Sequence, residues 1–218
     1  MKRYKILNLY ACLGGNRFKW DEVAEIEVTA VELDPELARL YQERFPNDTV
    51  IIADAHQYLL DHYKEFDFIW SSPPCPTHSR MVKATKHDIS VYPDMKLYEE
   101  IIFLQHFFKG KYVVENVISY YHPLIQPHKS SRHYYWANFR FRELNNLPKI
   151  KDMSRATRAV MATYLGFDYL GPNFYIKGNH DPAQVLRNCV HPNEGKTILE
   201  TALGIIKKQN VNQVSIFD

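Results

Sequence analysis

Short apolar runs alternate with amphipathic segments along the first half of the chain. Tyr4–Tyr10, Glu27–Leu33, Thr49–Ala53 and Phe66–Trp70 each have the length and apolar content of a strand that is covered on both faces. A segment with helical spacing follows each of the first three runs, and a polar or glycine-bearing turn ends each of them. This repeating unit predicts a Rossmann-like α/β fold with a mostly parallel, doubly wound sheet.

The remaining pattern predicts further elements. Lys111–Val117 is typical of a fifth strand, whereas the aromatic run Arg132–Phe139 favours an antiparallel or edge strand, and hence an antiparallel edge hairpin. Asp34 followed by Pro35 is a helix start signal. The predicted helices are, in chain order, the segment opened by Asp34-Pro35, Ala55–Tyr63, Met95–Phe108, Arg155–Leu165, a short helix from Asp181-Pro182, and Gly195–Lys208.

Chemically active side chains stand at the ends of the predicted strands, where open α/β sheets bind their ligands. Glu32 ends the second strand, Asp54 follows the third, and Cys75 and Glu115 follow or end the next two. Glu32 suits the ribose hydroxyls of a nucleoside cofactor and Asp54 an adenine amine, although either can equally be a helix cap. The first turn offers only Gly14-Gly15, so the dinucleotide fingerprint is absent and a mononucleoside cofactor such as S-adenosylmethionine fits better.

Composition adds little to this picture. The 218 residues fit one α/β domain, and the three cysteines make no metal-type pair, so we expect no metal site and a reducing compartment. The sequence has no signal peptide pattern and no membrane-span pattern, which predicts a cytoplasmic protein. The net charge is only +2, but residues 128–158 contain eight basic and two acidic side chains. This segment suits a polyanionic partner, although a solvated face has the same composition.

Cys75 and Glu115 together indicate one specific reaction. A lone cysteine at a strand end is more often a small buried apolar residue than a nucleophile. A thiol and a carboxyl group on neighbouring strands, with a one-carbon donor, can methylate a pyrimidine at carbon 5. The thiolate adds to carbon 6 and makes carbon 5 nucleophilic, while the protonated carboxyl group takes up charge at ring nitrogen 3. A base then removes the hydrogen from carbon 5, and the thiol leaves.

With these residues in place, the chain resembles the cytosine-5 DNA methyltransferases. Asn8–Gly15 is similar to the family motif Asp-Leu-Phe-x-Gly-x-Gly-Gly, which binds S-adenosylmethionine. Pro73-Pro74-Cys75 resembles the catalytic Pro-Cys motif, although Pro76 replaces the usual Gln. Glu115-Asn116-Val117 resembles the Glu-Asn-Val motif, whose carboxyl group engages the cytosine. The order of these motifs is more specific than any one of them.

Later motifs extend the resemblance nearly to the end of the chain. Arg132 resembles one arginine of a Gln-x-Arg-x-Arg motif, and Thr157–Asp168 resembles the ninth motif. Arg187–Val190 is similar to Gly-Asn-Ser-Val, which completes the cofactor pocket. The resemblance implies catalytic roles for Cys75, Glu115 and Arg132. It implies S-adenosyl-L-methionine as the cofactor, held by Leu9, Tyr10, Cys12, Gly14, Gly15, Glu32, Leu33, Asp54, Ala55, Pro73, Asn188, Cys189 and Val190.

The resemblance also implies binding of double-stranded DNA and flipping of the target cytosine. Only Arg142–Met153 remains for the family's variable target-recognition region, so we expect a short or relaxed sequence preference. The polar stretch Thr77–Pro93 is expected to close over the flipped base as a lid. DNA contacts, mainly to phosphates, are expected from Ser79, Arg80, Lys83, Arg140, Arg142, Lys149 and Lys151.

The expected organisation has three parts. Residues 1–141 form the catalytic and cofactor-binding core, residues 142–182 form a reduced target-recognition and DNA-binding region, and residues 183–218 fold back onto the core. We expect a restriction-modification or phage-type enzyme in the cytoplasm of a bacterial or phage-infected host cell.

Three alternatives remain open from the sequence. Amino-group methyltransferases carry a Ser-Pro-Pro-aromatic tetrad, which Ser72-Pro73-Pro74 matches in part, but cysteine in the fourth position cannot stack on a base as tyrosine does. The same cytosine chemistry can act on RNA or on a free nucleotide. The departures at Asn8, Cys12 and Pro76 also allow an inactive, methyltransferase-like subunit that binds DNA or a partner.

Overall fold

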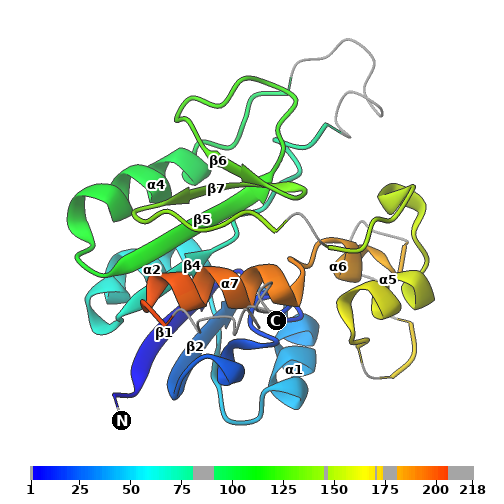
Figure 1. The fold of residues 1–218 in the computed structure, drawn as a ribbon, viewed down its shortest axis with the longest axis horizontal. Coiled ribbons are helices and arrows are strands. Elements are labelled where there is room, and N and C mark those ends of the chain that lie inside the picture. The colour runs from blue at the N-terminus through cyan, green and yellow to red at the C-terminus, as the bar shows by residue number, and fades with distance from the viewer. Residues whose placement is uncertain (1, 81–90, 145–146, 170, 174–180, 206–218) are drawn as a thin grey trace, which may run out of the picture.

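The computed structural model describes residues 2–80, 91–144, 147–169, 171–173 and 181–205. It contains a seven-stranded sheet with the order β3-β2-β1-β4-β5-β7-β6 (Figure 1). The first five strands in this order are parallel, β7 is antiparallel to β5, and β6 is antiparallel to β7. This confirms the predicted Rossmann-like fold and its edge hairpin. The strands are β1 (Tyr4–Leu9), β2 (Ile26–Glu32), β3 (Thr49–Ile52), β4 (Phe68–Ser71), β5 (Lys111–Val117), β6 (His128–Ser130) and β7 (His133–Ala137).

Capping residues fix the helix ends, as predicted for Asp34 and Gly166, whereas α5 begins three residues after the predicted Arg155 because Thr157 caps it. Asp34 accepts hydrogen bonds from two backbone N–H groups in the first turn of α1, at 2.9 and 3.0 Å. Thr157 caps α5, and Gly166, with φ of 76°, ends it in the left-handed conformation that favours glycine. The helices are α1 (Pro35–Arg44), α2 (Ala55–His62), α4 (Lys96–Phe107), α5 (Arg158–Leu165), α6 (Gln184–Arg187) and α7 (Pro192–Ala202), with short 3₁₀ helices η1 (Trp20–Glu22), η2 (Tyr63–Glu65) and η3 (Met153–Arg155).

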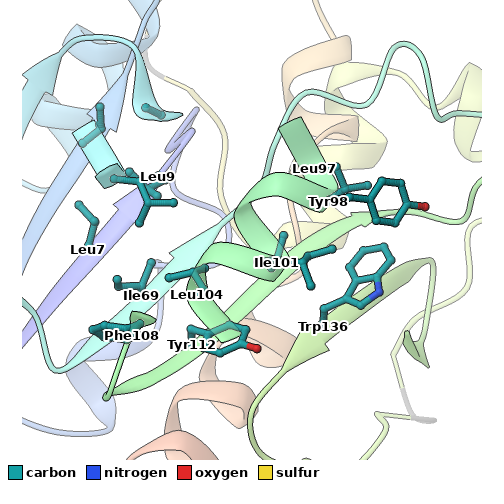
Figure 2. Packing of buried hydrophobic residues seen from close by; sticks show 14 residues of the cluster. Leu7, Leu9, Ile69, Leu97, Tyr98, Ile101, Leu104, Phe108, Tyr112 and Trp136 are labelled. Carbon is teal, nitrogen blue, oxygen red and sulfur yellow. The ribbon is translucent and has the colours of Figure 1, made fainter. Parts of the chain in front are cut away.

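Apolar side chains cover both faces of the sheet. Successive residues of a strand point to opposite faces, so Leu7 and Ile69 pack on one side while Ile6 and Phe68 pack on the other, all fully buried. Helices α2 and α4 cover the first side, and Figure 2 shows Leu104 and Ile101 of α4 beside Ile69, Tyr112 and Trp136 of the sheet. Helix α7 covers the second side. Each such side chain contributes roughly 1.5–3 kcal/mol by leaving water, and the two layers hold the strand ends in fixed positions.

The prediction of a helical segment after β1 is wrong. The chain forms a turn and the short η1 there, and Trp20 Nε1 donates to the carbonyl oxygen of Gly195 in α7 at 3.1 Å. A Cβ atom at Gly195 would lie 2.1 Å from the carbonyl oxygen of Asn16, so α7 and the loop after β1 are in direct backbone contact. Helix α7, from the far end of the chain, therefore packs where a helix after β1 would have to lie.

Helix α7 begins at Pro192, three residues before the predicted start, because proline suits the first helical position and the His191 side chain accepts from a backbone N–H as the cap. Its predicted end at Lys208 lies outside the described residues. Within the described ranges, no helix is long and apolar enough to cross a membrane, and no group of three His, Cys, Asp or Glu side chains could hold a metal ion.

Candidate active site

A cavity of about 720 Å³ opens at the carboxyl ends of the parallel strands. It extends from the ends of β1 and β2, where the cofactor is expected, to the ends of β4 and β5, which carry the thiol and the carboxyl group. Residues predicted for the site that line this cavity are Tyr10, Cys12, Glu32, Leu33, Asp54, Ala55, Pro73, Cys75, Glu115, Arg132 and Asn188. One cavity therefore brings together residues from the first and the last parts of the sequence.

Cys75 lies just beyond β4, in a sharply turning segment. Pro73-Pro74 ends the strand because proline cannot donate to a ladder. The backbone N–H groups of His78 and Ser79 donate to the Cys75 carbonyl oxygen at 2.9 and 3.0 Å, so the chain turns directly after the thiol. Burial, and then the negative charge of Glu115, raise the pKa of the Cys75 thiol to about 11. The attacking thiolate has to be generated in the occupied site.

Glu115 lies near the end of β5, beside β4 in the sheet. Parallel pairing of Ser71 with Val114 brings the ends of these two strands to the same edge. Asn116 donates its side-chain amide to the carbonyl oxygen of Pro73 at 3.0 Å, which ties the two ends together. Glu115 is 6 % exposed, and burial raises its pKa. A raised pKa favours the protonated acid that can donate to a ring nitrogen.

The β6–β7 hairpin places two basic side chains near this carboxyl group. His133 Nε2 lies 3.7 Å from Glu115 Oε1. Arg132 lines the cavity, and its guanidinium donates to the carbonyl oxygen of Arg187 at 3.2 Å. Positive charge on either side chain favours the ionised form of Glu115 and so opposes the effect of burial on its pKa.

At the other end of the cavity, the backbone fixes the carboxylate of Glu32. It accepts from the N–H groups of Cys12 at 2.8 Å and Asp34 at 3.0 Å, and burial raises its pKa. Tyr10 donates its hydroxyl to the fully buried Glu100 at 2.6 Å, which holds the tyrosine in the cavity wall. Each carboxylate oxygen can accept more than one hydrogen bond, so Glu32 retains acceptor sites for a ligand.

Asp54 is both a helix cap and a cavity residue. Its Oδ1 accepts from the Gln57 backbone N–H at 2.9 Å at the start of α2, and its Oδ2 lies 3.9 Å from Lys96 Nζ. The cap hydrogen bond is the main cause of its lowered pKa. Apolar lining near it comes from Leu33, Ala55, Leu97 and Pro73. An apolar wall with a carboxylate at each side is the set of groups that an adenosine moiety needs, so the residues present fit S-adenosylmethionine.

Five residues predicted to bind the cofactor lie outside the cavity lining, namely Leu9, Gly14, Gly15, Cys189 and Val190. Leu9 is fully buried in the core. A Cβ atom at Gly15 would lie 2.6 Å from the Val190 carbonyl oxygen and 2.7 Å from Cys189 Cβ. The absence of a side chain at Gly15 therefore lets the segment with Cys189 and Val190 pack against the turn after β1.

The side chains predicted to contact DNA are mostly exposed, as for Arg80, Arg140, Arg142, Lys149 and Lys151. Ser79 is half-buried and forms a β-bridge with Ser119. Lys83 and the central part of the predicted lid, residues 81–90, lie outside the described residues. Arg140, Arg142, Lys149 and Lys151 form no ion pair with any residue that the structure describes, so their charges are available to a phosphate backbone.

Residues at or beside the cavity that were not predicted as site residues include His78, His133, Arg187 and Glu194. His78 is 1 % exposed, its Nδ1 lies 2.7 Å from the Tyr121 hydroxyl, and burial lowers its pKa. Its position three residues after Cys75 is a local signal for a site residue. No local signal connects His133 with Glu194, because β7 and α7 bring them together only in the folded chain.

Comparisons with known proteins agree with this geometry. A family model described as C-5 cytosine-specific DNA methylase matches residues 4–123, just over half of the chain. No curated protein matches the chain. The solved structure of the Entamoeba histolytica methyltransferase EhMeth is similar at 12% identity and a TM-score of 0.54, covering 95% of this chain and 100% of that chain, which supports the fold alone. A DNMT2 mutant from Spodoptera frugiperda is similar at 25% identity and a TM-score of 0.37, covering 52% of this chain and only 35% of that chain.

Proposed function

Because the chain belongs to the C-5 cytosine-specific DNA methylase family, we propose that it methylates carbon 5 of cytosine in double-stranded DNA. The observation that carries this proposal is the pairing of Cys75 with Glu115 at one cavity. A half-buried thiol just beyond one strand and a buried carboxyl group on the adjacent parallel strand lie at the same edge of the sheet, and Asn116 ties their segments together. This is the pair of groups that activation of a pyrimidine at carbon 5 requires.

The methyl donor is S-adenosyl-L-methionine. Glu32, Asp54 and the apolar residues around them are the groups that would hold its adenosine part, and Arg187–Val190 would close the pocket beside them. When bound, the cofactor supplies an electrophilic methyl group. The chain's own contribution is to bind the cofactor and the cytosine in one cavity and to orient them toward each other.

Cys75 and Glu115 perform the activation. The Cys75 sulfur forms a bond to carbon 6 of a flipped cytosine, and Glu115 donates its proton to ring nitrogen 3 as charge develops there. Carbon 5 thereby becomes the nucleophile that accepts the methyl group. Loss of the carbon 5 proton to a base restores the double bond, the carbon–sulfur bond breaks, and the proton on nitrogen 3 returns to Glu115. The Cys75 thiol loses its proton to solvent before it attacks and regains one from solvent after the carbon–sulfur bond breaks, so the thiol and the acid end the cycle unchanged.

Contacts to DNA would come from the exposed basic residues after β7. Arg140, Arg142, Lys149 and Lys151 carry exposed charges that suit phosphates, which position a protein without reading sequence. The segment Arg142–Met153 is too short to build an ordered element that carries side chains into a groove. We therefore expect a short or relaxed preference for the DNA sequence around the target cytosine.

Labelled methyl transfer tests this function. The full chain is incubated with labelled S-adenosylmethionine and, in parallel, with duplex DNA, transfer RNA and deoxycytidine monophosphate. We expect label on carbon 5 of cytosine in the duplex, and none with the Cys75→Ala variant. Label only on the RNA or the nucleotide would overturn the DNA substrate, and transfer to none of the three would overturn the enzymatic function.

A further inference from the structure

A buried row of three titratable side chains runs from the active site into the protein. His133 Nε2 lies 3.7 Å from Glu115 Oε1, and His133 Nδ1 lies 3.8 Å from Glu194 Oε2. The three residues are 6 %, 5 % and 2 % exposed for Glu115, His133 and Glu194. One imidazole therefore stands between two carboxyl groups, and only the first of these faces the cavity.

Three separate elements build this row. Glu115 on β5 pairs with Tyr135 on the antiparallel β7, and His133 lies two residues earlier on β7, so all three side chains point to the same face of the sheet. That face is covered by α7, which carries Glu194 in its first turn. The row depends on α7 packing against the sheet in place of a helix after β1.

Polar atoms at the buried end of the row have no hydrogen-bond partner among the described residues. Both Glu194 oxygens and His133 Nδ1 are fully buried and have no hydrogen-bond partner among the described residues. Burying a carboxyl group whose oxygens make no hydrogen bond costs free energy, and the groups that face Glu194 are the His133 imidazole and the Tyr135 hydroxyl. The polar or titratable groups around the row are Ser72, Arg132, Tyr135, Tyr164 and His191.

We propose that His133 and Glu194 are positioning residues that supply Glu115 with its proton, so that Glu194 is a buried proton reservoir and His133 the bridge. The proposal rests on the proposed function for its role in catalysis. In the step, the separations of 3.7 and 3.8 Å close to hydrogen-bond distance in the substrate complex, and His133 Nε2 gives its proton to the Glu115 carboxylate while Glu194 gives its proton to His133 Nδ1. The imidazole changes tautomer and stays neutral, one carboxyl group gains the proton that the other loses, and the step reverses when the carbon–sulfur bond breaks.

The proposed reservoir resolves the opposite pH requirements of Cys75 and Glu115. The Cys75 thiol needs higher pH to ionise, whereas Glu115 must be protonated to act as an acid. A reservoir out of contact with water keeps a proton available to Glu115 at a pH where an isolated carboxyl group at the cavity wall would lose it. The proton moves within the buried row, so no exchange with solvent is needed during turnover.

The first test does not depend on activity. Infrared spectra of the free protein, recorded across pH 5 to 9, report the carbonyl stretch of protonated carboxyl groups. We expect a buried carboxylic acid band at neutral pH that Glu194→Gln removes and Glu200→Gln, on the same helix, leaves in place. If only Glu115→Gln removed the band, Glu194 would not be the reservoir. The absence of any such band in the unaltered protein would overturn the proposal without the need for a folded variant.

The second test uses the pH dependence of methyl transfer to duplex DNA. Glu194→Gln and His133→Gln should lose about tenfold or more of kcat at pH 8.5, and much less at pH 6, where solvent can protonate Glu115. His128→Gln, on the neighbouring strand, should keep the profile of the unaltered protein. An equal loss at every pH would indicate a structural role and contradict the proposal. Inactivity of the unaltered protein would instead contradict the proposed function and leave the infrared result to decide this inference.

Discussion

Asn116 donates its side-chain amide to the carbonyl oxygen of Pro73 across 3.0 Å, and so joins the residue after Glu115 to the segment that carries Cys75. The same side chain accepts from the Val117 backbone N–H at 2.9 Å, which fixes its orientation. Asn116 is 2 % exposed. The spacing of the two proposed catalytic groups therefore depends on one buried amide.

We predict that Asn116→Ala lowers methyl transfer about tenfold or more, because the loss of the amide frees Pro73 from β5 and loosens the thiol relative to the acid. It should also cost about 1–3 kcal/mol of stability, since the Pro73 carbonyl loses its partner. Asn138→Ala is the matched control, because Asn138 donates in the same way to the Gly110 carbonyl oxygen at 2.8 Å near the other end of β5. Its loss should lower stability but leave the rate nearly unchanged; equal rates in the two variants would refute this account.

Alkylation of Cys75 tests the cause of its raised pKa. With a pKa of about 11, the rate of carboxamidomethylation at Cys75 should rise roughly tenfold per pH unit from pH 7 to 10. Glu115→Gln removes a negative charge that disfavours the thiolate, so it should lower the pKa and speed alkylation at pH 9. Peptide mapping by mass spectrometry separates Cys75 from the other two cysteines. Asp94→Asn, also in the cavity wall, should have no such effect, and slower alkylation in Glu115→Gln would reverse the predicted sign.

Cofactor affinity should depend on Glu32. Glu32→Ala removes the carboxylate that Cys12 and Asp34 orient toward the cavity, and hydrogen bonds to a charged group contribute about 1.5–3 kcal/mol, so S-adenosylmethionine should bind at least about tenfold more weakly. Calorimetry measures this directly. Glu27→Ala, exposed on the same strand, should bind normally. If the two variants bound equally, the ribose site would have to lie elsewhere.

A buried ion pair stabilises the loop after β1. Arg17 donates to both oxygens of Asp48 at 2.9 Å, and Tyr41 donates to the same carboxylate at 2.9 Å. We predict that Asp48→Ala lowers the free energy of unfolding by about 3 kcal/mol, because it removes the buried partner of Arg17 and leaves that charge paired only with the exposed Asp21. Asp21 also pairs with Arg17 but is 68 % exposed, so Asp21→Ala should cost about 1 kcal/mol or less. Urea unfolding distinguishes the two, and equal losses would contradict this assignment.

Much of the fold could be predicted because its signals are local. The apolar runs of β1 to β5 bury both faces, and residues such as Asp34 and Gly166 mark helix ends by their own side chains or conformation. Cys75 and Glu115 could be placed at one site because parallel strands end at the same edge of a sheet. These inferences need only the order of residues and the period of the pattern.

The rest could not be predicted because it depends on contacts between distant segments. Nothing in Gly195 alone indicates that its backbone packs on Asn16 and takes the place of a helix after β1. The row formed by Glu115, His133 and Glu194 likewise exists only because α7 covers the face of the sheet that carries the first two. Its members follow no common spacing in the chain.

The most direct measurement uses duplex DNA with 5-fluorocytosine in place of cytosine. Fluorine at carbon 5 cannot leave as a proton does, so the adduct between the Cys75 sulfur and carbon 6 should persist. In the presence of S-adenosylmethionine, we predict a complex that survives denaturation, with the crosslinked peptide containing Cys75 and no complex for Cys75→Ser. Methyl transfer to ordinary cytosine without any trapped complex would contradict the covalent role of Cys75.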